Sequence, residues 1–559
     1  MDTQRLILLI IFSFSLFMLW EAWQKEKRPP PPHAEQQTAP TAPGSAQVPT
    51  PSVPQPSAAR APSSAAAAAP PVGGPSGQGT LIRIRTDVLI ADVSTLGGDI
   101  VRIELLKHKD TEDTSKNFVL LSPAHRYAAQ SGLIGDELPN HKTLFNAEAK
   151  EYVLGAEKEG GAASIEVRLE ATTTAGVRVA KVLTFRRGSY VIDITEEVTN
   201  GRQAPLEAHA YFQLTRDDKS PPGDTYMLRT FTGAAVYTEQ DKYVKVDFSD
   251  VDKGKTPYPK NADNGWIALV QHYFVSALIP EAKAQREFYT RRLAESYYSA
   301  GVILPLGPVP PGGTAKVTVP MYTGPQDLAQ LEKLAPGLDL VVDFGWLTIL
   351  AAPIFWLLQW IHQAVGNWGI AIILLTVLIK LIFYPLSAAS YKSMARMKLV
   401  TPRLTKLREQ YGNDRAKMNQ AMMELYKEEK INPLGGCLPI VVQIPVFIAL
   451  YWVLLGSVEL RHAPFYGWIK DLSTPDPWYI LPALMMGSMI IQTKLNPTPP
   501  DPVQAKVMMI MPFAFGVMFF FFPSGLVLYW LVNNILSIAQ QWQITRMLGD
   551  RKKPAEAKQ

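Results

Sequence analysis

The sequence has few of the residues from which catalytic, metal and disulfide frameworks are built. Its 559 residues include one cysteine, Cys437, which excludes an internal disulfide and any zinc site made of paired cysteines. No phosphate-binding loop or nucleophile motif is present. Five histidines fall in the middle of the chain without the spacing of metal ligands: His108, His125, His141, His209 and His272. We therefore expect no enzyme, no cofactor and no metal site.

The sequence also lacks a strong excess of one charge. Lys and Arg number 55 and Asp and Glu 50, for a formal net charge of +5. Residues 81–343 hold 30 basic and 35 acidic side chains, whereas residues 344–559 hold 20 and 11. A mildly acidic middle region lacks the basic face that nucleic acid binding needs, so we expect no nucleic acid partner. The apolar residues gather in the last third, which excludes a single soluble globule.

The first 80 residues divide into an apolar run and a proline-rich segment. Residues 6–20 are apolar, and no pair of small residues suited to signal cleavage follows Trp20. We interpret residues 1–28 as an uncleaved membrane anchor, although the basic residues after Trp20 would by themselves favour keeping that flank in the cytoplasm. Residues 29–80 hold 14 of the 46 prolines, a composition typical of a disordered tether.

Residues 81–340 change to alternating apolar and polar side chains. The segments 81–85, 164–169 and 190–195 follow this period of two and are rich in β-branched residues. Such segments predict antiparallel strands with one wet face. About 250 residues of this pattern predict a large β-sandwich.

After Asp343 the apolar runs approach the length of about 20 residues that crosses a bilayer. We predict a core at 367–548 with five spans, at 368–386, 438–456, 478–492, 507–522 and 526–544. The segment 344–361 is rich in tryptophan and contains Pro353. We interpret it as an amphipathic helix along the membrane surface, within residues 341–366. A further span is the alternative for this segment.

Basic loops set the orientation of these spans. Residues 387–431 carry ten basic and five acidic side chains, and the tail at 549–559 is also basic. By the positive-inside rule both lie in the cytoplasm, so six spans with both termini inside place the β-domain outside. Residues 388–431 predict a hairpin of two helices, at 388–411 and 414–430. Its methionines form an adaptable surface for partners or pack the two helices together: Met394, Met397, Met418, Met422 and Met423.

Lys380 is the sole formal charge within a predicted C-terminal span. A charge there costs a few kcal/mol unless it faces water or a partner, which makes Lys380 the leading functional candidate. The alternative is that its stem reaches the cytoplasmic headgroups. Other polar residues of the spans are Thr376, Gln443, Tyr529, Asn533, Ser537 and Gln540. These residues line a hydrated groove open to the cytoplasm or form ordinary hydrogen bonds between helices.

Three segments, NPLGGCLP at 432–439, GSVELR at 456–461 and FPSGLVLY at 522–529, closely resemble the YidC/Oxa1/Alb3 family of membrane protein insertases in its Gram-negative form. The similarity runs through 343–548. It implies a polytopic α-helical inner-membrane protein with an N-terminal anchor, a periplasmic all-β supersandwich, an interfacial helix, five core spans around a positively charged groove and a mobile cytoplasmic hairpin. It also implies nascent membrane proteins as substrates, cooperation with the Sec translocon and its accessory subunits, and ribosome contact through the basic tail and loops.

The groove charge of this family is usually arginine, where this sequence has Lys380. The positive charge is kept but the planar fork is lost, which argues against bidentate recognition of a carboxylate. The groove threonine and the last-span tyrosine of the family match Thr376 and Tyr529.

Two other functions fit the sequence less well. A secondary transporter or channel with a periplasmic sensor domain would show paired repeats and several intramembrane charges, and the sequence has neither. A glycan-binding or mutarotase-like β-domain on an anchor would need a set of carboxylates or histidines, and the sequence pattern identifies none.

Overall fold

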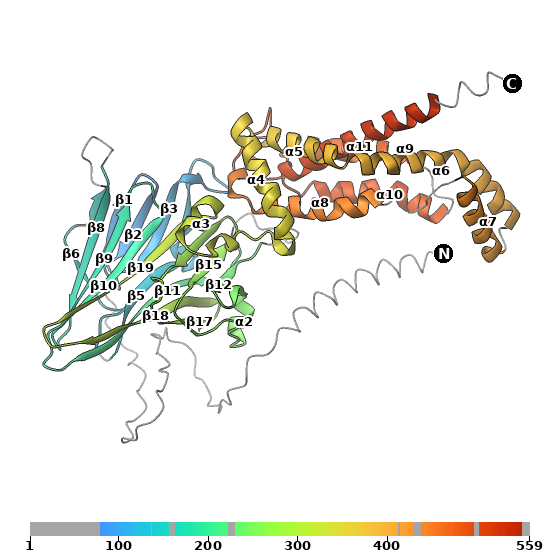
Figure 1. Cartoon of the computed structure of the whole chain (residues 1–559). Helices are drawn as coiled ribbons and strands as arrows, with labels where there is room; N and C mark the ends of the chain where they lie inside the picture. The colour runs from blue at the N-terminus through green and yellow to red at the C-terminus, as the bar shows by residue number, and fades with distance from the viewer. Residues whose placement is uncertain are drawn as a thin grey trace. The chain divides into compact units, whose positions relative to one another are not determined.

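The computed structural model describes residues 79–135, 137–155, 163–221, 230–411, 414–429, 438–496 and 502–550. The predicted anchor at 1–28, nearly all of the predicted tether and nearly all of the tail at 549–559 lie outside these residues. The described chain divides into a β unit that ends at Val342 and a helical unit that begins at Asp343 (Figure 1).

The β unit is built from two sheets, as the alternating pattern predicts. In the first sheet, listed so that neighbours are hydrogen-bonded, the strands are β14 (Asn261–Ala262), β17 (Arg286–Ala294), β18 (Tyr297–Val309), β11 (Leu206–Asp217), β5 (Ala128–Ile134), β3 (Ile100–Lys109), β2 (Leu89–Ser94), β1 (Leu81–Arg85) and β7 (Glu151–Val153), with β4 (Asn117–Leu121) paired to β3. The second sheet runs β13 (Lys242–Val246), β12 (Gly233–Thr238), β15 (Trp266–Gln271), β16 (Phe274–Leu278), β19 (Thr314–Pro325), β10 (Val191–Asn200), β9 (Val177–Arg186), β8 (Ser164–Thr172) and β6 (Asn146–Ala147). Short helices α2 (Phe248–Asp252) and α3 (Leu328–Leu334) lie in the same unit.

The period of two decides which side chains enter the core of the β unit. In β1, Ile82 and Ile84 are fully buried while the residues between and around them are exposed. In β8, Val167 and Leu169 are buried in the same alternation. The predicted antiparallel pairing is confirmed for both strands against β2 and β9. One pairing, β1 with β7, is parallel.

A buried polar cluster links the two sheets. Lys181 on β9 lies opposite Glu196 on β10, with Nζ 3.5 Å from Oε1. The same ammonium donates to the carbonyls of Gly97 (2.6 Å) and Ser131 (3.1 Å), which belong to the other side of the sandwich. Nearby, burial raises the pKa of Asp99 to about 7, although Lys181 and a hydrogen bond from Gln130 act in the opposite direction. The sequence pattern missed this set of carboxylates because its members come from distant strands.

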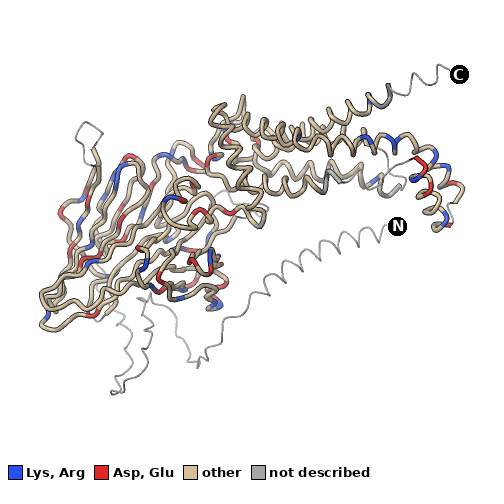
Figure 2. The backbone as a smooth tube through the Cα atoms, viewed as in Figure 1, with Lys and Arg blue, Asp and Glu red and all other residues tan. Residues whose placement is uncertain are grey.

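The helical unit contains α4 (Thr348–Val365), α5 (Trp368–Ile382), α6 (Tyr384–Tyr411), α7 (Arg415–Glu428), α8 (Leu438–Gly456), α9 (Ile480–Leu495), α10 (Pro502–Phe519) and α11 (Ser524–Asp550). Helix α11 packs against α5, α6, α8 and α9, so it is the central element of the unit. Helix α4 packs against α5 and α8, and α10 packs against α9. Figure 2 shows that basic residues of the helical unit lie mainly along α6 and α7, and Arg546 lies near the end of α11.

Helix α4 has one buried and one exposed face. Phe355 and Leu358 are buried, whereas Ile349, Trp356 and Trp360 are 86%, 67% and 60% exposed. Such a pattern suits a helix that lies along a membrane surface. By length and composition alone, α4 is the single unbroken helix among the described residues that could cross a membrane, and α5 with the start of α6 would form a bent pair. The surface position of α4 therefore stays a prediction.

The predicted span at 368–386 is interrupted by a bend. Helix α5 ends at Ile382, and α6 begins at Tyr384 after a bend of 68°. Pro385 is the second residue of α6, where its missing N–H leaves no helical hydrogen bond unmade. In the interior of a continuous helix the same proline would remove a bond and clash with the preceding turn. Pro385 was therefore the signal in the sequence for the break between α5 and α6.

Candidate functional site

Lys380 lies in the last turn of α5 and points into the helical unit. Its side chain is buried, and its Nζ donates to Ser537 Oγ on α11 at 2.8 Å. The ammonium is therefore directed toward α11 and not along its own helix toward Leu386. Thr376, one turn earlier, is also buried, but its hydroxyl donates to the carbonyl of Ile372 in the same helix.

A chain of hydrogen bonds extends from Lys380 across α11 to α8. Ser537 Oγ donates to the backbone carbonyl of Asn533 at 2.7 Å. Asn533 Oδ1 accepts from Gln443 Nε2 at 2.6 Å. Four of the predicted polar residues, from three helices, are thus brought together, and we call Lys380, Ser537, Asn533 and Gln443 the polar chain. Gln540 is half-buried and contributes no bond to it.

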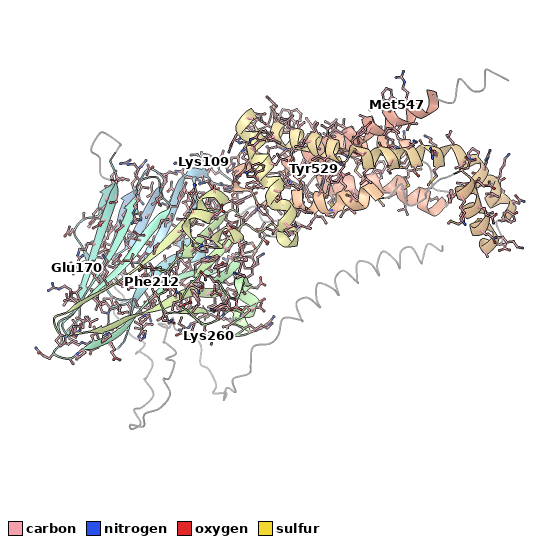
Figure 3. All side chains as sticks on the ribbon, viewed as in Figure 1. Lys109, Glu170, Phe212, Lys260, Tyr529 and Met547 are labelled. Atoms are coloured by element: carbon pink, nitrogen blue, oxygen red, sulfur yellow. The ribbon has the colours of Figure 1, made fainter. Side chains whose placement is uncertain are left out.

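Tyr529 lies on α11, within the helical unit (Figure 3). Its side chain is 1% exposed, and its ring centroid is 5.8 Å from that of Phe447. Its hydroxyl is buried beside the Gln443 side chain without a hydrogen bond of normal geometry. Phe447 stacks in turn on Trp530 at 4.8 Å. The polar chain therefore ends against an aromatic cluster, and one hydroxyl there is available to a new partner.

A second polar face of α11 was missed in the sequence. Asn534 Nδ2 donates to Ser488 Oγ at 2.7 Å, and Gln541 Nε2 donates to Asn496 Oδ1 at 3.0 Å. Asn534 and Gln541 are seven residues apart, which places both on the face that meets α9. This spacing of seven residues is visible in the sequence, and Asn534 directly follows the predicted site residue Asn533. It was the signal that could have identified Asn534 and Gln541 as a second polar face. These bonds fix α11 to α9, whereas the polar chain joins it to α5 and α8.

The predicted cytoplasmic hairpin forms from α6 and α7. Arg403 Nη1 on α6 lies 2.7 Å from Glu429 Oε1, just after the end of α7. Met423 is 51% exposed, so it is open to a partner. The other predicted methionines are half-buried, consistent with packing within the unit: Met394, Met397, Met418 and Met422.

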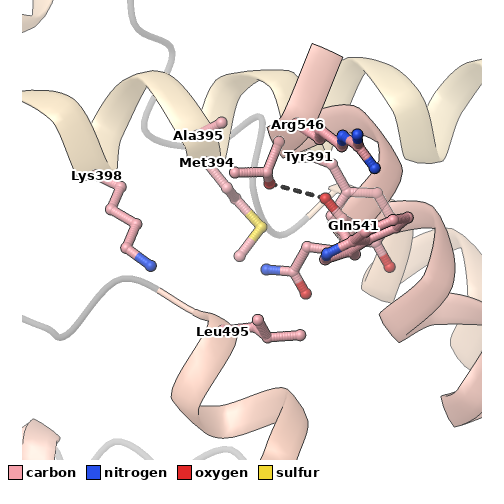
Figure 4. A pocket seen from close by; sticks show the side chains of 9 residues that line it. Tyr391, Met394, Ala395, Lys398, Leu495, Gln541 and Arg546 are labelled. Carbon is pink, nitrogen blue, oxygen red and sulfur yellow. Dashed lines mark hydrogen bonds between the residues drawn. The ribbon is translucent and has the colours of Figure 1, made fainter. Parts of the chain in front are cut away.

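A cavity of about 240 Å³ lies where α6 and α11 meet the end of α9. Figure 4 shows the side chains that line it. Its residues are Tyr391, Met394, Ala395, Lys398, Leu495, Gln541, Trp542, Thr545 and Arg546. The Tyr391 hydroxyl also lies beside Ser537, so the cavity borders the polar chain.

Comparison with known proteins decides the family. The model of the YidC periplasmic domain matches residues 81–357, and that of the 60Kd inner membrane protein matches residues 360–552. The membrane protein insertase YidC of Dechloromonas aromatica is 56% identical over 550 residues, which cover 98% of each chain. This chain belongs to the YidC family of membrane protein insertases. The family resemblance predicted from three short segments is thereby confirmed, and the transporter alternative is not favoured.

The chain is also similar to a second curated relative and to a solved structure. The membrane protein insertase YidC of Aromatoleum aromaticum is 56% identical over 559 residues and covers all of both chains. A crystal structure of an active YidC insertase with its first transmembrane domain resolved is 18% identical and covers 83% of this chain and 94% of that chain, with a TM-score of 0.37. As a member of this family the chain is a bacterial inner-membrane protein, and residues 81–357 match its periplasmic domain.

Proposed function

We propose that the helical unit inserts and folds integral inner-membrane proteins, alone or with the Sec translocon, by presenting the polar chain to an incoming segment. The observation that carries this proposal is the buried ammonium of Lys380, held by Ser537 between helices. A polar or acidic residue of a client costs a few kcal/mol in the hydrocarbon layer. The ammonium of Lys380 and the three neutral residues of the polar chain would lie part-way across the membrane. There they would offer such a residue a temporary hydrogen-bonding partner.

The hydrogen bonds of the polar chain are suited to reversible opening. A hydrogen bond between membrane helices contributes about 0.6 kcal/mol on average, with a maximum near 1.7 kcal/mol. The bonds Lys380–Ser537 and Gln443–Asn533 are therefore weak enough to exchange for bonds to a client. When they open, α11 separates from α5 and α8 and a hydrated groove forms between them. Burial of the apolar client segment in lipid then drives its release without nucleotide hydrolysis.

The orientation that we propose has five core spans around this groove. The α6–α7 hairpin, the connection between α9 and α10 and both termini lie in the cytoplasm, and the anchor at 1–28 supplies a sixth span. The excess of basic residues on the hairpin and after Thr545 supports this orientation. The same basic surfaces would contact the ribosome, and the exposed Met423 would receive the hydrophobic nascent chain.

Substitution of Lys380 tests the proposal. The substrate is a membrane protein with an acidic translocated segment, and the measurement is its insertion into vesicles that contain the purified variant. We expect Lys380→Arg to retain insertion, Lys380→Ala to lose several-fold, and Lys380→Glu to lose at least about tenfold because like charges repel within the bilayer. Lys506→Glu, an exposed residue at the start of α10, is the matched control and should insert normally. Equal insertion by all three Lys380 variants would contradict the proposal.

A further inference from the structure

The cavity between α6 and α11 has the charge of an anion site. Among the described residues that line it, the formally charged ones are Lys398 on α6 and Arg546 on α11, and none of these residues is a carboxylate. Gln541, Thr545 and Tyr391 add neutral hydrogen-bonding groups (Figure 4). Arg546 also lies over the Trp542 ring, with its guanidinium carbon 5.5 Å from the centroid. Two basic side chains beside an aromatic ring form a suitable site for an anionic group at a membrane interface.

An exposed apolar stripe on α11 leads to this cavity. Ile535 is 50% exposed and Trp542 is 57% exposed, with the exposed Ala539 between them. Arg546 follows on the same face, since the four residues are spaced by four, three and four. Exposed apolar side chains on a membrane helix face lipid tails. An acyl chain that lies along the stripe would thus place its headgroup beside Lys398 and Arg546.

We propose that this cavity binds the headgroup of an anionic phospholipid whose acyl chain follows the stripe Ile535–Ala539–Trp542. The volume of about 240 Å³ leaves room for a phosphate group with a small polar headgroup. The two cations, without a carboxylate among the lining residues, select an anionic headgroup over a zwitterionic one.

The bound lipid would bridge the two helices that border the polar chain. Lys398 belongs to α6 and Arg546 to α11, and the intervening Tyr391 lies beside Ser537. The headgroup would therefore hold α6 against α11 at the end where the proposed groove opens. This inference rests on the membrane location of the family and not on the route of insertion, so either can fail without the other.

Native mass spectrometry of the full-length protein tests the inference directly. Phosphatidylglycerol and phosphatidylcholine are added in turn to the detergent-solubilised protein. Each basic side chain near an anionic headgroup contributes a factor of roughly five in affinity, so Lys398→Gln with Arg546→Gln should weaken phosphatidylglycerol binding about thirty-fold. The exchange Lys398→Arg with Arg546→Lys should retain it. Lys392→Gln with Lys506→Gln, two exposed residues outside the cavity, is the matched control and should bind as the unaltered protein does.

Two further experiments distinguish a bound phospholipid from other occupants of the cavity. Inorganic phosphate at the same concentration should not compete, because it lacks the acyl chain; full competition would assign the cavity to a free anion. A photoreactive residue at Ala395 should form adducts with phosphatidylglycerol; adducts with a stalled nascent chain alone would assign the cavity to the client. Equal retention of both lipids by the unaltered protein, or equal binding by the cavity and control variants, would overturn the inference.

Discussion

At the scale of single residues, the sequence reveals the charge of Lys380 but not the partner of that charge. One charge in an apolar run is conspicuous, so the sequence alone makes Lys380 a functional candidate. Its partner Ser537 is 157 residues away along the chain, and no pattern in the sequence specifies that contact. The hydrogen bond that Lys380 donates to Ser537 needs only a compact point charge, which lysine supplies without the planar fork of an arginine.

Asp99 in the β unit provides a residue-scale prediction of pH dependence. Burial raises its pKa from 3.8 to about 7, so the folded state favours the neutral acid. Its contribution to stability is fully present below pH 3.8 and is lost as the pH rises through about 7. The full-length Asp99→Asn variant should therefore gain stability relative to the unaltered protein between pH 4 and 8, by up to about 4 kcal/mol.

Thermal unfolding of the β unit in the full-length protein, followed across this pH range, checks the prediction. The exposed Asp241→Asn is the control and should leave the difference from the unaltered protein independent of pH. A constant difference for Asp99→Asn as well would show that the carboxyl group is not held neutral by burial.

At the scale of elements, hydrophobic runs and turn residues predicted most helices. The predicted span at 438–456 coincides with α8, and the predicted hairpin helices correspond to α6 and α7. The break at Phe383 was missed because an apolar run passes through it without a change in hydropathy. The far end of α11 was also missed, because its last residues are largely polar and carry no apolar signal, and the helix continues to Asp550.

The second polar face of α11 leads to a prediction for helix packing. Asn534→Ala removes the bond to Ser488, whose hydroxyl still donates to the carbonyl of Met485. We expect a loss of about 0.6–1.7 kcal/mol in unfolding free energy, as is usual for hydrogen bonds between membrane helices, with insertion nearly unchanged. Denaturant-induced unfolding of the detergent-solubilised protein measures this loss in unfolding free energy. Ile535→Ala, exposed on the same helix, should have less effect, and an equal loss would mean that the bond does not stabilise the packing.

At the scale of the whole molecule, the chain divides into a β unit and a helical unit. The alternating pattern predicted two-sheet architecture in the β unit, because one wet face and one buried face impose a period of two. The same pattern could not reveal the buried Lys181–Glu196 pair, since long-range pairing decides which polar residues meet inside the sandwich. The sequence thus predicted the layers of the fold but not its internal polar contacts.

Deletion of the β unit tests this division of labour. Each residue of the polar chain belongs to the helical unit, so removal of residues 81–330 should leave more than about half of the insertion activity. The reason is that the hydrogen bonds Lys380–Ser537 and Gln443–Asn533 involve no residue of the β unit. Insertion by the truncated protein in vesicles, with its amount in the membrane matched to that of the full-length chain, provides the measurement. Complete loss would contradict the proposed division.

The most direct test of the central claim is site-specific crosslinking from position 529 to a stalled nascent membrane protein. Tyr529 is 1% exposed in the closed helical unit, so a client can reach it only if α11 separates from its neighbours. A photoreactive residue at 529 should crosslink the nascent chain, and Lys380→Glu should reduce that product when the client segment is acidic. The lipid-facing position 535 serves as the control. Crosslinks from 535 but not from 529 would show that clients bypass the polar chain.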